Sequence, residues 1–281
     1  GYGHWKWTGD YAAALAFYRR AIAAKPDEAF FLEEFDHVAE EAKRPVKERY
    51  EMLKAHHATA AKRSAALVME CVNGIFEGDY DSVLTLMRTQ YFTTFEGAAD
   101  FHDHYVDALL LKGAELEKQG DAKGAIRLYN ECFEFPAAHQ VFVYDKRRPR
   151  DAQIRHALGR AYEGLGDAVR AGTNYAEGAA ADTLKTDYCY WKALCLEQLG
   201  RHAEAKVIGA ALVNKGSKTH DDDVDFFDYG GNRYGSAKDA GNAAAAYARG
   251  LGALLLGDRA SAKRAFDECL ALKPDHLWAK V

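Results

Sequence analysis

The sequence predicts an all-α fold, a right-handed α-α superhelix in which helix pairs stack as a solenoid with irregular insertions. The first observation is composition, because the 281 residues are rich in alanine and include only five prolines. Alanine has the highest helix propensity, and its small side chain lets helices approach closely. The second is a repeated signature, in which a turn glycine is followed by alanine five residues later and by an aromatic residue four residues after that. Such a repeat indicates stacked helix pairs.

Two copies of the signature have identical spacing and end in proline: Gly9–Ala14–Tyr18–Pro26 and Gly257–Ala262–Phe266–Pro274. The other copies are Gly120–Ala125–Tyr129, Gly166–Ala171–Tyr175, Gly200–Ala205 with Gly209 at the aromatic position, and a degraded copy from Gly78. We expect the glycine to end the first helix of each pair in a left-handed turn. The alanine is expected where the two helices touch, the aromatic residue in the gap to the next pair, and the proline after the second helix.

Two first helices share a spacing of residues before the turn glycine: Leu158, Gly159 and Tyr162 before Gly166, and Gly113 and Leu116 before Gly120. This is the spacing of tetratricopeptide (TPR) repeats, which the sequence therefore resembles. The resemblance implies one TPR-like domain over residues 1–281, with degenerate repeats in 1–104 and clearer repeats in 105–281. Only the end of a first helix, with Tyr2 and Trp5, precedes Gly9. We therefore expect the chain to begin inside a repeat of a longer protein.

The repeats are interrupted in several places, and about six helix pairs are expected. Residues 28–43 and 46–61 are predicted as plain helices separated by Arg44–Pro45. Insertions are predicted at residues 136–150 and 214–241, because the turn glycines on either side are further apart than the TPR period of about 34 residues. Insertions in such arrays form loops, which hold functional residues more often than the scaffold does.

Short motifs along nearly the whole chain resemble a second family: Phe95–Glu96–Gly97 with Tyr105, Phe135–Pro136, Asp225–Phe226–Phe227 with Tyr229, Tyr247–Gly250–Gly252 before Gly257, and Pro274–Asp275–His276. This bacterial family joins an N-terminal, galactose-mutarotase-like sugar-binding region to a C-terminal TPR array. Its loops contain more glycine and asparagine, whereas the loop after Phe135 here continues Ala137–Ala138–His139–Gln140. The resemblance implies carbohydrate handling, with the sugar-processing part outside this chain.

Composition argues against several classes of partner. The net charge is −5 and no basic stripe is present, so nucleic acid is not an expected partner. The basic cluster at residues 146–150 is interpreted as a solvated loop, with an anion contact as the alternative. Five cysteines without C-x-x-C spacing favour neither a disulfide framework nor a zinc site, and Cys132 and Cys269 fall at small buried positions. No apolar run has transmembrane length, so a membrane is not an expected partner.

Two clusters suggest a metal site, but neither fits one. His102 and His104 are two residues apart, and on a helix such side chains point about 200° apart and cannot share a metal. The acidic run at residues 220–225 lacks the sixth-position glycine and twelfth-position glutamate of an EF-hand, since Phe226 and Asn232 stand there. We interpret the run as a solvated loop or a helix N-cap. No catalytic motif is recognised, and no metal, no cofactor and no catalysis by this chain alone are expected.

The register of the repeats predicts a binding surface. In TPR arrays the first helix of each repeat lines the concave face, and this register places six residues there: His156, Arg160, Asp187, Tyr190, Trp191 and Tyr247. Aromatic residues beside arginine form a site for a peptide or another extended ligand. The alternative is that Tyr190 and Trp191 pack beneath the 214–241 insertion.

Two functions are compatible with these patterns. The first is a non-catalytic helical-repeat scaffold that binds a protein, a peptide or an N-terminal domain missing from this chain. The second is the C-terminal helical part of a larger carbohydrate-active protein, which would help to shape a sugar site. An upstream β-rich domain in the longer protein would favour the second function.

Overall fold

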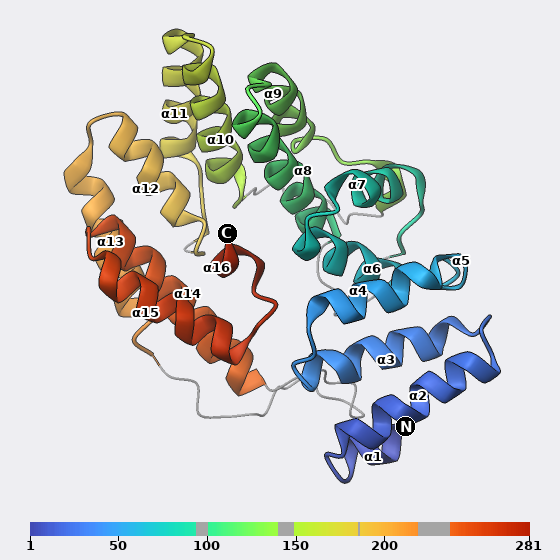
Figure 1. Cartoon of the computed structure of the whole chain (residues 1–281). Coiled ribbons are helices and arrows are strands. Elements are labelled where there is room, and N and C mark those ends of the chain that lie inside the picture. The colour runs from blue at the N-terminus through green and yellow to red at the C-terminus, as the bar shows by residue number, and fades with distance from the viewer. Residues whose placement is uncertain (94–100, 140–148, 185, 219–236) are drawn as a thin grey trace. The chain divides into compact units, whose positions relative to one another are not determined.

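The computed structural model describes residues 1–93, 101–139, 149–184, 186–218 and 237–281 (Figure 1). These residues form α-helices, one 3-10 helix and connecting turns, and no β-strand occurs among them. The predicted all-α class, a TPR-like solenoid of helix pairs, is therefore confirmed. The chain forms two compact units. The described residues 1–93, 101–108, 136–139 and 237 belong to unit 1, and the other described residues to unit 2.

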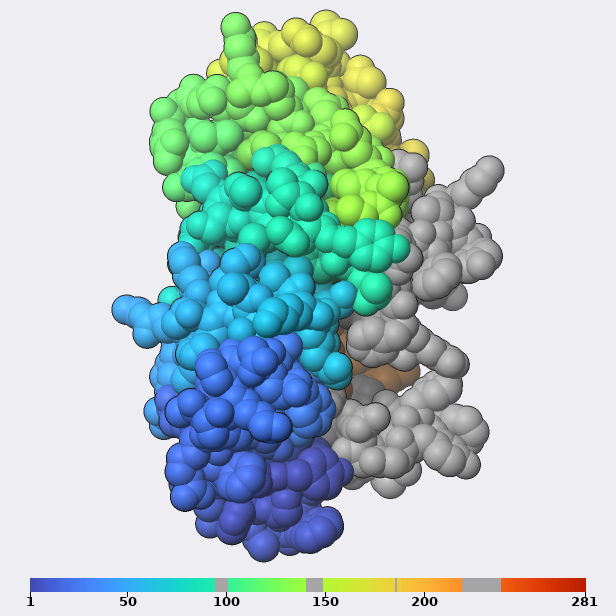
Figure 2. Space-filling model, turned by 90° about the vertical axis from the view of Figure 1, so that its right-hand side faces the viewer, coloured from blue at the N-terminus to red at the C-terminus, as the bar shows by residue number. Residues whose placement is uncertain are grey.

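Unit 1 is a series of short helices. In Figure 2 its blue and cyan segments follow one another in chain order. Its elements are α1 (Tyr2–Lys6), α2 (Tyr11–Ala24), α3 (Ala29–Glu41), α4 (Val46–Ala55), α5 (His57–Ala60), α6 (Ser64–Glu77), α7 (Tyr80–Thr89), the start of α8 (Phe101–Lys118) and the 3-10 helix η1 (Ala137–His139). Helices α1 and α2, α3 and α4, and α6 and α7 pack as pairs.

Unit 2 continues the same pattern from residue 109 of α8. Its further elements are α9 (Ala122–Glu131), α10 (Asp151–Gly164), α11 (Ala168–Ala180), α12 (Cys189–Gln198), α13 (His202–Lys215), α14 (Ala237–Leu255), α15 (Arg259–Leu272) and α16 (Leu277–Lys280). The pairs α8–α9, α10–α11, α12–α13 and α14–α15 make up this unit, and α16 follows the last pair.

The turn inside each pair is specified by two residues. Six glycines there have a left-handed backbone with φ between 64° and 86°: Gly9, Gly78, Gly120, Gly166, Gly200 and Gly257. In four of these turns the next residue is an aspartate whose carboxylate accepts a backbone N–H three residues further on, at 2.8–2.9 Å: Asp10, Asp121, Asp167 and Asp258. Each of these N-caps satisfies a free N–H group and stabilises the second helix by about 1 kcal/mol. The glycine prediction is confirmed, and the aspartate completes the turn.

The aromatic residue of the signature packs over a glycine in the first helix of its own pair. A Cβ atom on Gly159 would lie 2.3 Å from Cε1 of Tyr175, and one on Gly113 would lie 2.2 Å from Cε1 of Tyr129. Tyr175 also lies in one buried cluster with Ala193 of α12, in the next pair. The predicted role between pairs is thus confirmed for Tyr175. Gly159 and Gly113, each seven residues before a turn glycine, leave the space that the tyrosine ring fills.

Gly209 stands where the α12–α13 pair should have its aromatic residue, and close helix packing explains the departure. A Cβ atom on Gly252 of α14 would lie 2.6 Å from the carbonyl oxygen of Gly209. One on Gly216 would lie 2.4 Å from the carbonyl oxygen of Ala245. Helices α13 and α14 therefore touch backbone to backbone, and a large side chain at residue 209 would separate them.

The described part of the chain has seven helix pairs rather than about six, because α3 and α4 pair without a glycine turn. Lys43 adopts the left-handed φ of 51° at this turn, and Pro45 precedes α4. The predicted helix 28–43 corresponds to α3. The predicted helix 46–61 corresponds to α4 and α5, which are separated at His56.

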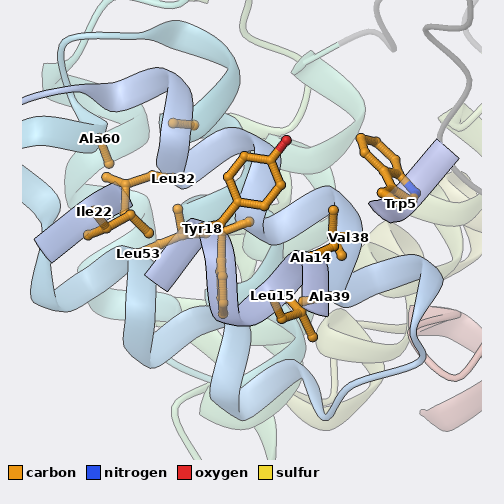
Figure 3. Close-up of a cluster of buried hydrophobic side chains, with 12 residues drawn as sticks. Trp5, Ala14, Leu15, Tyr18, Ile22, Leu32, Val38, Ala39, Leu53 and Ala60 are labelled. Carbon is orange, nitrogen blue, oxygen red and sulfur yellow. The ribbon is translucent and has the colours of Figure 1, made fainter. Parts of the chain in front are cut away.

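The core of unit 1 is built from apolar side chains of α1 to α4 and their neighbours (Figure 3). Leu32, Phe35 and Leu53 are at most 1% exposed, and burying each such side chain contributes about 2 kcal/mol. Trp5 is 3% exposed, and its Nε1 donates a hydrogen bond to Glu41 at 2.5 Å. These contacts hold the short helix α1 against α2 and α3.

A buried ion pair connects three helices of unit 1. Arg49 of α4 donates to both carboxylate oxygens of Asp36 of α3, at 3.0 and 2.8 Å. Their side chains are 5% and 0% exposed. Asn73 of α6 donates to the same carboxylate at 2.9 Å. Arg49 also pairs with Glu40 at 3.3 Å. Loss of Arg49 would leave the buried Asp36 carboxylate without its cation, which costs about 3–5 kcal/mol.

The predicted insertion at residues 136–150 begins with η1, which packs against α7. His139 is fully buried, and its Nε2 lies 2.7 Å from the carbonyl oxygen of Met87. Its ring contacts those of Phe92, Phe101 and Tyr105, with centroid distances of 6.0, 5.0 and 4.8 Å. The start of this insertion is therefore anchored in the core of unit 1, and residues 140–148 lie outside the described residues.

The predicted insertion at residues 214–241 is shorter at both ends than expected. Helix α13 continues to Lys215, and α14 already begins at Ala237. The acidic run at residues 220–225 and the motif at 225–229 lie outside the described residues, as do residues 95–97.

Candidate functional site

Four of the six predicted binding residues lie together in unit 2. His156 belongs to α10, Tyr190 and Trp191 to α12, and Tyr247 to α14, which are the first helices of three successive pairs. The ring centroids of His156 and Trp191 are 5.6 Å apart, and those of Tyr190 and Trp191 are 5.3 Å apart. Tyr190 and Tyr247 belong to one hydrophobic cluster. We call these four residues the aromatic face.

The turn before α12 places its two aromatic residues at the start of the helix. The backbone N–H of Tyr190 donates to the carbonyl oxygen of Asp187 at 3.0 Å, which closes this turn. Neighbouring residues on a helix point about 100° apart. Tyr190 therefore lies in the cluster with α14, while Trp191 lies against His156 of α10.

His156 is the most buried of the aromatic residues in contact with Trp191, at 7% exposure. Burial lowers the pKa of His156 from 6.5 to about 3, and the positive charge of Arg160 lowers this pKa further in the same direction. Its imidazole is therefore neutral at physiological pH. It contributes an apolar ring surface to the face and does not act as a proton donor near neutrality.

Trp191 is covered on one side by a residue that follows the last repeat. The ring of Trp278 in α16 packs edge-on against Trp191, with centroids 5.9 Å apart and an interplanar angle of 75°. T-shaped pairs of this kind contribute about 0.5–1.5 kcal/mol beyond the burial of their area. The alternative cover, the 214–241 insertion, falls largely on residues outside the described part of the chain, so that prediction stays a prediction.

Tyr247 is 9% exposed and lies between two rings. Its centroid is 5.9 Å from that of Phe266 on α15 and 4.5 Å from that of His276 before α16. Burial lowers the pKa of His276, and the charge of Lys273 adds to the effect. The Nδ1 atom of His276 accepts the backbone N–H of Ala279 at 3.2 Å, which requires the neutral ring and caps α16.

The other two predicted residues form ion pairs beside the aromatic face. Arg160 has a side chain 48% exposed and donates to Glu117 at 2.9 Å. Asp187 has a side chain 27% exposed and accepts from Lys215 at 2.7 Å. Exposed ion pairs of this kind contribute about 0–1 kcal/mol. Both charged side chains are therefore held only weakly by these pairs.

The aromatic face thus consists of rings with few rotatable bonds. The two charged residues beside it are a hydrogen-bond donor, Arg160, and an acceptor, Asp187. Cys189, which has a thiol that could act as a nucleophile, directly precedes Tyr190 of the aromatic face. Burial raises the pKa of this thiol, and the carboxylate of Asp187 raises it further, so the thiol stays protonated at neutral pH.

Sequence reasoning missed Trp278 and His276, although both contact the predicted residues. The pattern contained a signal, because Pro274–Asp275–His276 follows α15 as Pro26–Asp27–Glu28 follows α2. An aromatic residue follows each proline by four residues: Phe30 follows Pro26, and Trp278 follows Pro274. The parallel predicts a helix start, but it does not predict which surface the helix covers.

Several other expectations can be placed on the structure. Arg150 is 4% exposed, donates to Gln153 at 2.9 Å and lies over the ring of Tyr188. Arg150 is therefore not part of a solvated basic loop. Residues 146–148 of the same cluster lie outside the described residues. His102 and His104 both lie on α8. The described residues contain no group of three or more His, Cys, Asp or Glu side chains placed to hold a metal. Within the same residues, no helix is both long and apolar enough to cross a bilayer.

Three solved structures are similar to nearly the whole chain at low sequence identity. A TPR protein from Parabacteroides merdae is 11% identical with a TM-score of 0.47, over 97% of this chain and 91% of that chain. The C-terminal part of a TPR repeat-containing protein from Cytophaga hutchinsonii is 15% identical with a TM-score of 0.41, over 97% and 94%. YrrB, described as a TPR protein with an unusual peptide-binding site, is 16% identical with a TM-score of 0.25, over 94% and 95%.

Comparison with protein families identifies the repeats themselves. The tetratricopeptide repeat model matches residues 8–28, which include the Gly9 turn and α2. It also matches residues 186–208, which include Asp187, Tyr190 and Trp191. No protein of curated function matches the sequence. With its helix pairs, its left-handed glycine turns and these two matched segments, the chain contains tetratricopeptide repeats.

Proposed function

We propose that this chain is a non-catalytic helical-repeat scaffold that binds a protein partner through a peptide segment held on the aromatic face. The observation that supports the proposal is the contact of His156 of α10 with Trp191 of α12, two successive first helices, with the Tyr190 ring beside that of Trp191 on α12. Clustered aromatic rings, with arginine nearby, are typical of the residues that dominate binding energy at protein interfaces.

The partner class follows from the size and charge of the surface. Tyr190 and Trp191 of α12 are half-buried and can contact apolar side chains of a peptide, while the buried rings of His156 on α10 and Tyr247 on α14 support them. Arg160 and Asp187 flank these rings and have opposite charges, so they can discriminate between peptides and orient them. A segment of a longer polypeptide that contains this chain would be a partner of the same class.

Selection from a library of displayed random peptides tests the proposal. We expect the selected peptides to bind the wild type and to lose about tenfold or more in affinity on Trp191→Ala, since an aromatic hot spot contributes about 2 kcal/mol or more. Trp7→Ala is the matched control, because Trp7 is 83% exposed, belongs to unit 1 and lies outside the aromatic face. Peptides that bind Trp191→Ala and the wild type equally well would contradict the proposal.

The carbohydrate-linked alternative stays a prediction that rests on the motif resemblance. Two of its motif residues have packing roles in the described structure, since Gly250 faces Phe266 and Gly252 faces the backbone of Gly209. Glycan-array binding by this chain would support the alternative. Loss of that binding in Tyr247→Ala would locate it on the aromatic face.

A further inference from the structure

Two rows of side chains cross the first helices α10, α12 and α14 of unit 2 (Figure 1). The first row stands ten residues before each turn glycine and belongs to the aromatic face: His156, Tyr190 and Tyr247. The second row stands three residues before the same glycines: Glu163, Glu197 and Leu254. Helices α10 and α12 pack directly on each other, so the two carboxylates come from neighbouring helices.

The carboxylates of Glu163 and Glu197 lie beside the aromatic face. Residues seven positions apart lie on one side of a helix, about 10 Å apart along its axis. Glu163 is therefore on the side of α10 from which His156 contacts Trp191. Glu197 is on the side of α12 that carries Tyr190. A ligand that contacts Tyr190 and Trp191 is thus within about two helical turns of both carboxylates.

No lysine, arginine or histidine among the described residues forms an ion pair with Glu163. This residue is exposed, and its Oε2 accepts the hydroxyl group of Tyr175 at 2.7 Å, a hydrogen bond that brings no positive charge. Arg160 stands one turn earlier on α10, but it pairs with Glu117 of α8 at 2.9 Å. Glu163 therefore presents a negative charge to a ligand.

Glu197 has a side chain that is 34% exposed and lies 2.5 Å from Nδ1 of His202. An imidazole ring is a cation only when it is protonated, so this contact does not provide a permanent positive charge. Arg201, in the turn between α12 and α13, pairs with Glu204 at 2.7 Å. The arginines near both carboxylates of the second row are thus paired with other residues, Glu117 and Glu204.

We propose that the peptide bound by the aromatic face is cationic, and that its lysine or arginine side chains pair with Glu163 and Glu197. Its apolar side chains contact Tyr190 and Trp191. This inference rests on the proposed function and specifies its ligand. The two carboxylates determine specificity more than affinity, because exposed ion pairs are weak whereas an acidic peptide would meet charges of its own sign.

Three synthetic peptides of about 14 residues test the charge of the ligand. They share leucines at helical spacing and differ only in the residues between them, which are all lysine, all glutamine or all glutamate. Binding of each fluorescein-labelled peptide to the full chain is measured by fluorescence anisotropy. We expect the lysine peptide to bind about tenfold more tightly than the glutamate peptide, and added salt to reduce this difference.

Removal of the two charges tests their position. Glu163→Gln combined with Glu197→Gln keeps the size of both side chains and an oxygen that accepts hydrogen bonds. It should weaken binding of the lysine peptide about tenfold, about threefold for each charge, and leave that of the glutamine peptide unchanged. The matched control is Glu177→Gln combined with Glu204→Gln, which removes two charges from the second helices α11 and α13. This control should keep the affinity for the lysine peptide within about twofold.

The outcomes separate this inference from the proposed function. Equal binding of the lysine and glutamate peptides, no binding of the lysine peptide, or equal effects of the two double variants would overturn the cationic ligand. If library-selected peptides still lost affinity on Trp191→Ala in that case, the proposed function would stand without it. Binding of the lysine peptide that Trp191→Ala leaves unchanged would also overturn the inference, because the carboxylates would then act apart from the aromatic face. Circular dichroism checks that each variant is folded, and Tyr190→Ala replaces Trp191→Ala if the latter unfolds.

Discussion

The close contact between Gly159 and Tyr175 makes a quantitative prediction about how the repeats are held together. In Gly159→Ala the new Cβ atom would lie 2.3 Å from Cε1 and 2.6 Å from Cδ1 of Tyr175. Because ordinary carbon contacts are about 3.5–4 Å, the ring must move by about 1 Å. Tyr175 is 2% exposed, and its hydroxyl donates to Glu163 at 2.7 Å, so little space is available for this movement.

The expected cost is a balance of two opposing effects. Overpacking of a filled core costs about 1–3 kcal/mol, while replacing a helical glycine by alanine stabilises the helix by about 1 kcal/mol. Gly159→Ala should therefore lower the free energy of unfolding by up to about 2 kcal/mol. Gly172→Ala is the matched control on α11, because a Cβ atom there meets no atom within 4 Å, and it should raise that free energy by about 1 kcal/mol.

Urea denaturation followed by circular dichroism measures both variants. The two substitutions are chemically identical and lie on the two helices of one pair, so their difference isolates the contact with Tyr175. If Gly159→Ala were as stable as Gly172→Ala, the packing of the signature aromatic over the glycine of its own pair would be refuted.

Two other perturbations follow from buried charges. Burial lowers the pKa of His156 and of His37 from 6.5 to about 3, so the stability that each neutral ring provides is complete above pH 6.5 and is lost as the pH falls toward 3. Between pH 7.5 and 5 each histidine should lower the free energy of unfolding by about 2 kcal/mol, and His156→Gln should remove about half of the combined decrease in urea titrations. Arg49→Met should cost about 3–5 kcal/mol in the same assay because it leaves the Asp36 carboxylate buried without its cation, whereas Asp36→Leu with Arg49→Met should cost less.

Much of the fold could be predicted from the sequence because the repeat signature has direct physical causes. Gly120 and Gly166 stand where a left-handed turn is needed, and Ala125 and Ala171 stand where two helices touch at 0% and 2% exposure. These positions tolerate few residue types, so they are visible in a single sequence. The α3–α4 pair was not recognised as a repeat because Lys43 adopts the left-handed turn that glycine adopts elsewhere.

The candidate site was predictable only in part. The register placed His156, Trp191 and Tyr247 on first helices, and the structure has them there. Arg160 and Asp187 were also expected on this face, but their ion pairs, Arg160 with Glu117 and Asp187 with Lys215, were not predicted. These pairs depend on which helices are adjacent in space, and helical periodicity does not contain that information. The contact of Trp278 with Trp191 is likewise a long-range contact that no local pattern predicts.

The most direct test of the proposed binding face is a ¹⁹F NMR titration of the chain labelled with 5-fluorotryptophan. The sequence contains four tryptophans, which are Trp5 and Trp7 in unit 1 and Trp191 and Trp278 in unit 2. Substitution of each tryptophan by phenylalanine assigns its resonance. We predict that a library-selected peptide shifts the resonances of Trp191 and Trp278 and leaves those of Trp5 and Trp7 unchanged. Shifts confined to Trp5 and Trp7, or no shift of Trp191 at saturating peptide, would contradict the account.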